Sequence, residues 1–167
     1  MKLAEQIKKL LEQHTIPLHV SLSRNTGQAV AALQTASFAN RINADIVLSL
    51  SCYKPKNNRS CITVYRFSYQ DELNIKQPDL SWCPYDKAHL QKSSITKEYS
   101  HKIVGTLKNN LVASDVQGPY AVPYKPLIGM QSPALGFECG IQSIQECNEC
   151  ARIIYLSIVE LIDDIAH

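Results

Sequence analysis

The sequence lacks the features that mark membrane, secreted and nucleic-acid-binding proteins. No apolar run reaches the roughly 18 residues that a membrane span requires, and the N-terminal stretch carries acids and lysines throughout, unlike a secretory signal peptide. The formal net charge is only +2, because 17 Lys and Arg side chains are matched by 15 acids. That balance favours neither nucleic acid nor a membrane as a partner. We therefore expect one soluble, cytoplasmic domain over residues 1–167.

A nucleophile motif is also missing. The serine at the end of "DIVLSLS", Ser51, is not flanked by the glycines of a hydrolase elbow. None of the histidines lies in a recognisable nucleophile motif; they are His14, His19, His89, His101 and His167. Nucleophilic catalysis by Ser51 or Cys52 is therefore disfavoured, because a hydroxyl or thiol needs a base within reach.

The six cysteines are expected to be reduced, because the chain shows no export signal. Cys147 and Cys150 have the Cys-x-x-Cys spacing of a redox or zinc half-site, but no second pair follows and they fall within a predicted helix. A role as small buried hydrophobic side chains is favoured. A zinc site that joins Cys52 and Cys139 at two neighbouring strand ends stays open as an alternative.

Hydrophobic periodicity predicts alternating helices and strands. Helical spacing of apolar residues predicts helices over 1–14, 28–42, 94–111 and 143–166. Strands are predicted over 18–23, 45–51, 60–69 and 132–140, with residues 120–130 irregular and ending in a short strand. Residues 70–92 read as a long surface excursion. The order favours an α/β fold with a mainly parallel sheet and helices on both faces.

Two strand ends stand out as places for a site, because ligands of parallel sheets gather at the carboxyl ends of strands. One end is Ser51-Cys52 and the other is Glu138-Cys139. A carboxylate directly after the apolar stretch "PALGF" is costly to bury unless it is paired. Glu138 is therefore either a general acid/base or a strand-end glutamate that faces solvent.

Together these segments resemble the catalytic domain of zinc-dependent N-acetylmuramoyl-L-alanine amidases. "VSLSRNT" resembles the family strand that ends in Thr-Arg, "ALQTASFANRINADIVLSLS" the stretch that closes on Ser-x-His, and "SPALGFECGIQS" the stretch around the catalytic glutamate. The positions that match are Arg24, Leu33, Ala39, Asn40, Ala44, Asp45, Ser49, Pro133, Ala134, Glu138 and Gly140. The resemblance places Glu138 at the catalytic glutamate and implies an amidase-like fold.

The resemblance fails at the metal ligands. The family binds zinc through a Gly-His-Gly-Gly turn, a glutamate at the start of the first helix and the histidine of Ser-x-His. The chain begins inside that helix, so we expect it to lack the family's first strand; Glu5 is a weak candidate for the glutamate, and Ser51 stands at the histidine position. A neutral hydroxyl is a poor zinc ligand. The arginine of the family's Leu-x-x-Arg is Ala36 here.

The family hydrolyses the amide between muramic acid and the stem peptide of peptidoglycan, with a metal-bound water and the glutamate as acid/base. Because the zinc ligands are missing, we predict a degenerate, non-catalytic domain. Such a domain would bind a peptidoglycan fragment or a peptide, or would serve as a regulatory module. The alternative is an active amidase with replacement ligands from Cys52 or Cys139 and with Glu138 as general base. A third possibility is a homo-oligomer through an open sheet edge, because unpaired edges invite a second chain. Family members normally act outside the cytoplasm.

Overall fold

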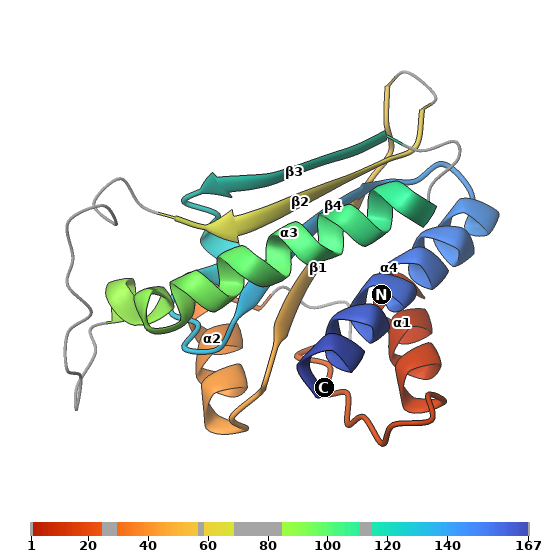
Figure 1. Ribbon diagram of the computed structural model, residues 1–167. Coiled ribbons are helices and arrows are strands. Elements are labelled where there is room, and N and C mark those ends of the chain that lie inside the picture. Colours follow the sequence, from red (N-terminus) through yellow and green to blue (C-terminus); the bar gives the residue numbers. More distant parts are fainter. Residues whose placement is uncertain (1, 25–29, 57–58, 69–84, 111–114, 167) are drawn as a thin grey trace.

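The computed structural model describes residues 2–24, 30–56, 59–68, 85–110 and 115–166. Its strands are β1 (Val47–Tyr53), β2 (Cys61–Phe67), β3 (Asp115–Val122) and β4 (Ala134–Gly140). Its helices are α1 (Lys2–Glu12), α2 (Ala32–Arg41), α3 (Ser93–Asn110) and α4 (Ile144–Ala166), with 3-10 helices η2 (Tyr85–Lys92) and η3 (Lys125–Leu127). Figure 1 shows α3 and α4 across one face of the sheet, with α1 beside α4.

The four strands form one sheet in the order β1-β4-β2-β3. β1 is parallel to β4 and β2 is parallel to β3, whereas β2 and β4 are antiparallel. Two of the three pairings are parallel, so the predicted mainly parallel α/β sheet is confirmed. The antiparallel junction at its centre was not predicted. In this register Glu138 lies between Ser51 of β1 and Thr63 of β2.

The sheet is covered on both faces because successive side chains of a strand point to opposite sides. Leu135, Phe137 and Cys139 of β4 belong to the larger core, which they share with α1, α3 and α4. Ala134 and Phe67 belong to a smaller core on the opposite face, with α2 and η3. This explains why β4 is an almost continuous apolar run: it is a central strand buried on both sides.

The four helices confirm the helical periodicity of the sequence. α4 buries residues three or four apart against the larger core, which is the spacing of an amphipathic helix: Ile154, Ile158 and Leu161. In α1 the buried side chains have the same spacing: Leu3, Ile7 and Leu11. Within the described ranges, none of the helices combines the length and the apolar character that a membrane crossing requires.

The predicted strand over residues 18–23 is wrong, because this segment has no regular secondary structure. Its apolar side chains Leu18 and Val20 do pack against the larger core, and Lys8 Nζ donates a hydrogen bond to the Val20 carbonyl over 2.7 Å. The apolar side chains that alternate along this segment therefore do face the core. A strand also needs a neighbouring backbone to pair with, and alternation alone does not supply one.

Residues 120–130 also differ from the prediction. The strand comes first, as β3, and is followed by η3 rather than by a short strand at its end. Pro123 follows β3 directly, and its missing N–H cannot continue a ladder. Most of the predicted excursion over 70–92, including Pro78, Trp82 and Pro84, lies outside the described residues, and its last part forms η2.

Candidate functional site

Glu138 lies near the carboxyl end of β4, in the middle of the sheet, with its side chain half-buried. Because strands alternate, the cross-strand neighbours Ser51 and Thr63 present their side chains on the same face. The sequence therefore correctly placed Ser51 and Glu138 together. The smaller core covers the same face near the start of β4. The carboxylate lies beyond that core, towards the carboxyl end of the strand.

Tyr65 of β2 holds the carboxylate. Its hydroxyl Oη donates a hydrogen bond to Oε2 of Glu138 over 3.0 Å. Burial, and then the hydrogen bond to Glu138, raise the pKa of Tyr65 to about 12. The phenol is therefore protonated at neutral pH and serves as a donor to the carboxylate.

Tyr124, between β3 and η3, forms a second aromatic layer over the site. Its ring stacks on Tyr65 with centroids 5.0 Å apart and planes 5° apart. Burial raises the pKa of its hydroxyl, although a hydrogen bond with Ser51 acts in the opposite direction. The ring lies directly against Gly136 of β4, where an added Cβ would stand 2.5 Å from the Tyr124 Cε1 atom. Glycine is therefore needed at this strand position to seat the tyrosine.

Beyond Glu138 on the same face of the sheet, a tyrosine and a thiol contact each other beside Gly140 of β4. Tyr53 Oη and Cys61 Sγ are 2.9 Å apart across Gly140, at the carboxyl end of β1. The hydrogen bond with Cys61, followed by burial, raises the pKa of Tyr53 to about 12. Tyr53 remains 45% exposed to solvent. Together with Tyr120, which is 46% exposed and lies 6.0 Å from Tyr65 between ring centroids, it borders the site with aromatic surface.

The other residues that the sequence suggested do not join this site. Cys52 and Cys139 are cross-strand neighbours, but each directly follows a residue of the Glu138 face and so points to the opposite side of the sheet. Cys139 is fully buried in the larger core. Glu5 is exposed on α1, which packs with α4 on that opposite side.

The sequence pattern alone did not point to the two tyrosines of this site, Tyr65 and Tyr124. Tyr65 alternates with Thr63 and Phe67 along β2, so its face was available from the strand pattern once the register was known. Tyr124 had no signal, because it lies in irregular chain and reaches the site only through the fold of β3 and η3. Both belong to the candidate site on geometry alone.

The described residues directly around Glu138 do not form a set of zinc ligands. Its neighbours Ser51, Tyr65 and Tyr124 offer neutral hydroxyls, whereas zinc sites in proteins use imidazole, thiolate and carboxylate. In the part of the chain that the structure describes, no group of three or more His, Cys, Asp or Glu side chains is arranged to hold a metal ion.

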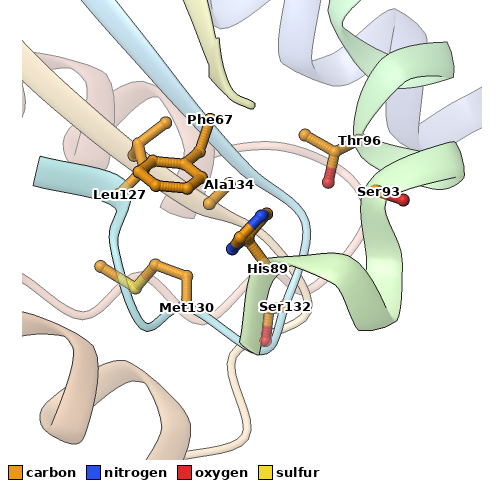
Figure 2. A pocket seen from close by; sticks show the side chains of 8 residues that line it. All are labelled: Phe67, His89, Ser93, Thr96, Leu127, Met130, Ser132 and Ala134. Carbon is orange, nitrogen blue, oxygen red and sulfur yellow. The ribbon is translucent and has the colours of Figure 1, made fainter. Parts of the chain in front are cut away.

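A small cavity lies on the same face at the far end of the sheet from Glu138. Figure 2 shows its lining, with His89 of η2 facing Phe67 and with Ala134, the first residue of β4, beside them. The His89 and Phe67 rings are 4.4 Å apart between centroids. The cavity volume is about 10 Å³, which is room for about one water molecule. It is therefore a packing feature and not a ligand site.

The raised tyrosine pKa values predict how stability changes in alkali. A phenol whose pKa rises from 10 when unfolded to about 12 when folded contributes stability that is complete below pH 10 and lost as the pH rises towards 12. We expect the free energy of unfolding to fall over that window, and Tyr65→Phe to make the fall shallower. Urea unfolding across this pH range, with phenolate absorbance of the folded chain, tests this. Phenolate formation by all folded tyrosines near pH 10 would contradict it.

Comparisons with known proteins agree on a fold. No protein-family model matches the chain, and no curated protein matches its sequence. The structure is similar to the catalytic domain of CwlV, an N-acetylmuramoyl-L-alanine amidase from Bacillus (Paenibacillus) polymyxa var. colistinus, with a TM-score of 0.66 and 14% identity over 97% of this chain and 82% of that one. Ami1 from Mycobacterium smegmatis, an N-acetylmuramyl-L-alanine amidase, has a TM-score of 0.66 and 13% identity, covering 97% and 74% of the two chains.

A third similar structure is the N-acetylmuramoyl-L-alanine amidase AmiC2 of Nostoc punctiforme, with a TM-score of 0.58 and 16% identity over 96% of this chain and 81% of that one. At such low identity, structural similarity establishes the fold and leaves the activity open. The arrangement of sheet and helices that carries Glu138 is therefore the fold of N-acetylmuramoyl-L-alanine amidases.

Proposed function

We propose that this chain is an amidase-like domain without zinc-dependent catalysis, which binds a peptidoglycan fragment or a peptide over Glu138. The observation that carries the proposal is the set of partners around the carboxylate. The Tyr65 hydroxyl donates a hydrogen bond to Glu138, and Ser51 lies beside the carboxylate. The resemblance to zinc-dependent amidases implies a metal ion near this carboxylate, with a histidine ligand at the position of Ser51.

The chemistry of those partners argues against hydrolysis. Cleavage of an amide by a carboxylate as general base needs an activated water and a group that stabilises the developing negative charge. A metal ion supplies both, and it contributes several kcal/mol of charge stabilisation. Neutral phenols with pKa values well above 7 do not lower the pKa of a water in the same way.

Binding remains within the capacity of the site. A carboxylate can accept about four hydrogen bonds, and Tyr65 occupies one of these positions. Glu138 is half-buried rather than sealed, and exposed faces of Tyr53 and Tyr120 border it. A ligand with amide N–H groups or an ammonium group and an apolar or sugar face would use both features.

The positions of the two candidate replacement ligands argue against the alternative of an active amidase. Cys52 and Cys139 lie on the other side of the sheet from Glu138, so a metal held by them could not share a water with that carboxylate. The same experiment tests both functions.

The test combines metal analysis, turnover and binding. The full chain, purified with zinc present in the buffers, is expected to hold far less than one zinc per chain and to release no peptide from a muramyl-peptide. Titration calorimetry with the same muramyl-peptide should show binding that Glu138→Gln weakens about tenfold, because a charge-assisted hydrogen bond is lost. Glu149→Gln, at an exposed position on α4, is the matched control and should bind like the parent chain.

Stoichiometric zinc together with turnover would refute the proposal in favour of the active enzyme. Equal binding by the parent chain and Glu138→Gln would show that this carboxylate does not contact the ligand. Absence of any binding would remove muramyl-peptides as the ligand class.

A further inference from the structure

Four thiols gather on the side of the sheet opposite Glu138, where β1, β4 and the start of α4 meet. We call them the thiol cluster: Cys52, Cys139, Cys147 and Cys150. All four are free. Cys139 and Cys150 are buried in the larger core, and Cys147 packs against it. None of them takes part in the site around Glu138.

The strand register places the Cα atoms of two of these cysteines at a spacing that a disulfide can span. Cys52 of β1 and Cys139 of β4 are direct partners in the parallel pair. Neighbouring strands lie about 4.8 Å apart, which is inside the range of about 4.4–6.8 Å that disulfides need between Cα atoms. Both side chains point to the same face because they hold equivalent places in the pleat.

The helix supplies the other two thiols. The Cys139 thiol is hydrogen-bonded to Cys150, and this contact, together with burial, holds the pKa of Cys139 far above its usual range. Burial raises the pKa of Cys52, and the nearby Cys150 and Cys147 raise it further. Each strand thiol therefore has a helix thiol close enough to affect its ionisation.

One member of the cluster is open to small reagents. Cys52 is exposed, and with Cys147 it lines a shallow pocket that Lys2 and Lys54 also border. Cys139 and Cys150 are at most 8% exposed. A reagent from solvent would therefore meet Cys52 first, with the buried thiols placed behind it.

We propose that the thiol cluster is a redox site, in which a peroxide oxidises Cys52 and a second thiol of the cluster closes an intramolecular disulfide. Cys52 attacks one peroxide oxygen, the O–O bond breaks, and the products with hydrogen peroxide are Cys52 sulfenic acid and water. A neighbouring thiol then attacks the sulfenic sulfur and releases a second water. Two thiols lose two electrons in total, and the peroxide gains them.

The expected partner of Cys52 is Cys139, its direct cross-strand neighbour in the β1–β4 register. The bond would link β1 to β4 directly after Ser51 and Glu138. The proposal is independent of the proposed function, because the cluster and Glu138 lie on opposite faces of the sheet.

The rate should follow the ionisation of the thiols. The thiolate is the reactive form, and the pKa values of Cys52 and Cys147 both lie above the ordinary value of 9.0. Oxidation is therefore expected to be slow at neutral pH and to quicken as the pH rises. The cluster is suited to sustained oxidising conditions rather than to rapid sensing.

The test uses the reduced full chain treated with hydrogen peroxide. Titration of thiols after denaturation should show that two of the six thiols are lost and recovered with dithiothreitol. Trypsin should then leave Cys52 on residues 42–56 linked to the peptide of residues 109–152, which holds the other three thiols of the cluster. Cleavage after Glu138, Glu146 and Glu149 separates those three and identifies the partner.

Two matched variants complete the test. Cys52→Ser should form the disulfide about tenfold more slowly or not at all, because the accessible thiol is gone. Cys61→Ser, on the opposite face, should react like the parent chain. A linkage through Cys61 or Cys83, a linkage only between chains, no disulfide, or an unchanged rate in Cys52→Ser would overturn the proposal. The peptide map of the unsubstituted chain decides the case even if a variant does not fold.

Discussion

Replacing Phe137 with alanine is expected to lower the free energy of unfolding by about 3–5 kcal/mol, the usual cost of removing a fully buried aromatic ring. Phe137 is 0% exposed and belongs to the larger core beneath the helices. It lies on β4 between Gly136 and Glu138, with its side chain on the opposite face from the site. The ring therefore anchors the strand that presents the carboxylate.

Urea unfolding followed by circular dichroism measures this effect, with Ile144→Ala as the control. Ile144 is 65% exposed at the start of α4, so its truncation should change stability by less than about 0.5 kcal/mol. Similar losses for the two variants would mean that β4 is not the packed centre of the fold.

The second large effect is expected at Gly118 of β3. Its backbone has φ +98, and an added Cβ would lie 2.4 Å from the carbonyl oxygen of Val64. The position follows Thr63↔Gln117 and precedes Tyr65↔Tyr120, where the β2–β3 register shifts. Gly118→Ala combines an unfavourable φ with a clash against backbone, so a loss of about 2–4 kcal/mol is expected.

Gly105→Ala is the matched control and should have the opposite sign. Gly105 lies inside α3, and a Cβ there would meet nothing within 4 Å. Alanine in a helix interior is favoured over glycine by about 0.5–1 kcal/mol. Thermal unfolding of both variants gives the comparison. If Gly118→Ala were neutral, the register shift that sets Tyr120 beside Tyr65 would not depend on glycine.

The environment of Glu138 is the basis of the proposed function. The carboxylate lies on an inner strand of the sheet, its hydrogen-bond partner is a protonated phenol and its cross-strand neighbour is a serine. Each of these groups can orient a bound ligand through hydrogen bonds. None can replace the charge of a divalent cation, which is the part of the chemistry that a hydroxyl cannot supply.

Much of the fold could be read from the chain because it follows from local periodicity. The apolar spacing in α1 and α4 and the largely apolar stretches of β1 and β4 predicted those elements without any long-range information. The same local reasoning failed for residues 18–23, whose alternation matches a strand. Side-chain alternation shows which residues face a core, but strand formation also requires a backbone partner.

By itself, the sequence determined the α/β class, the helices and the strand ends on which Ser51 and Glu138 stand, because these depend on residue periodicity along the chain. Only the tertiary structure decided which groups meet there. The antiparallel β2–β4 pairing brings Tyr65 to Glu138, and irregular chain after β3 lays Tyr124 over Gly136. The pleat separates Cys52 and Cys139 from that site, because adjacent residues of a strand must face opposite sides of the sheet.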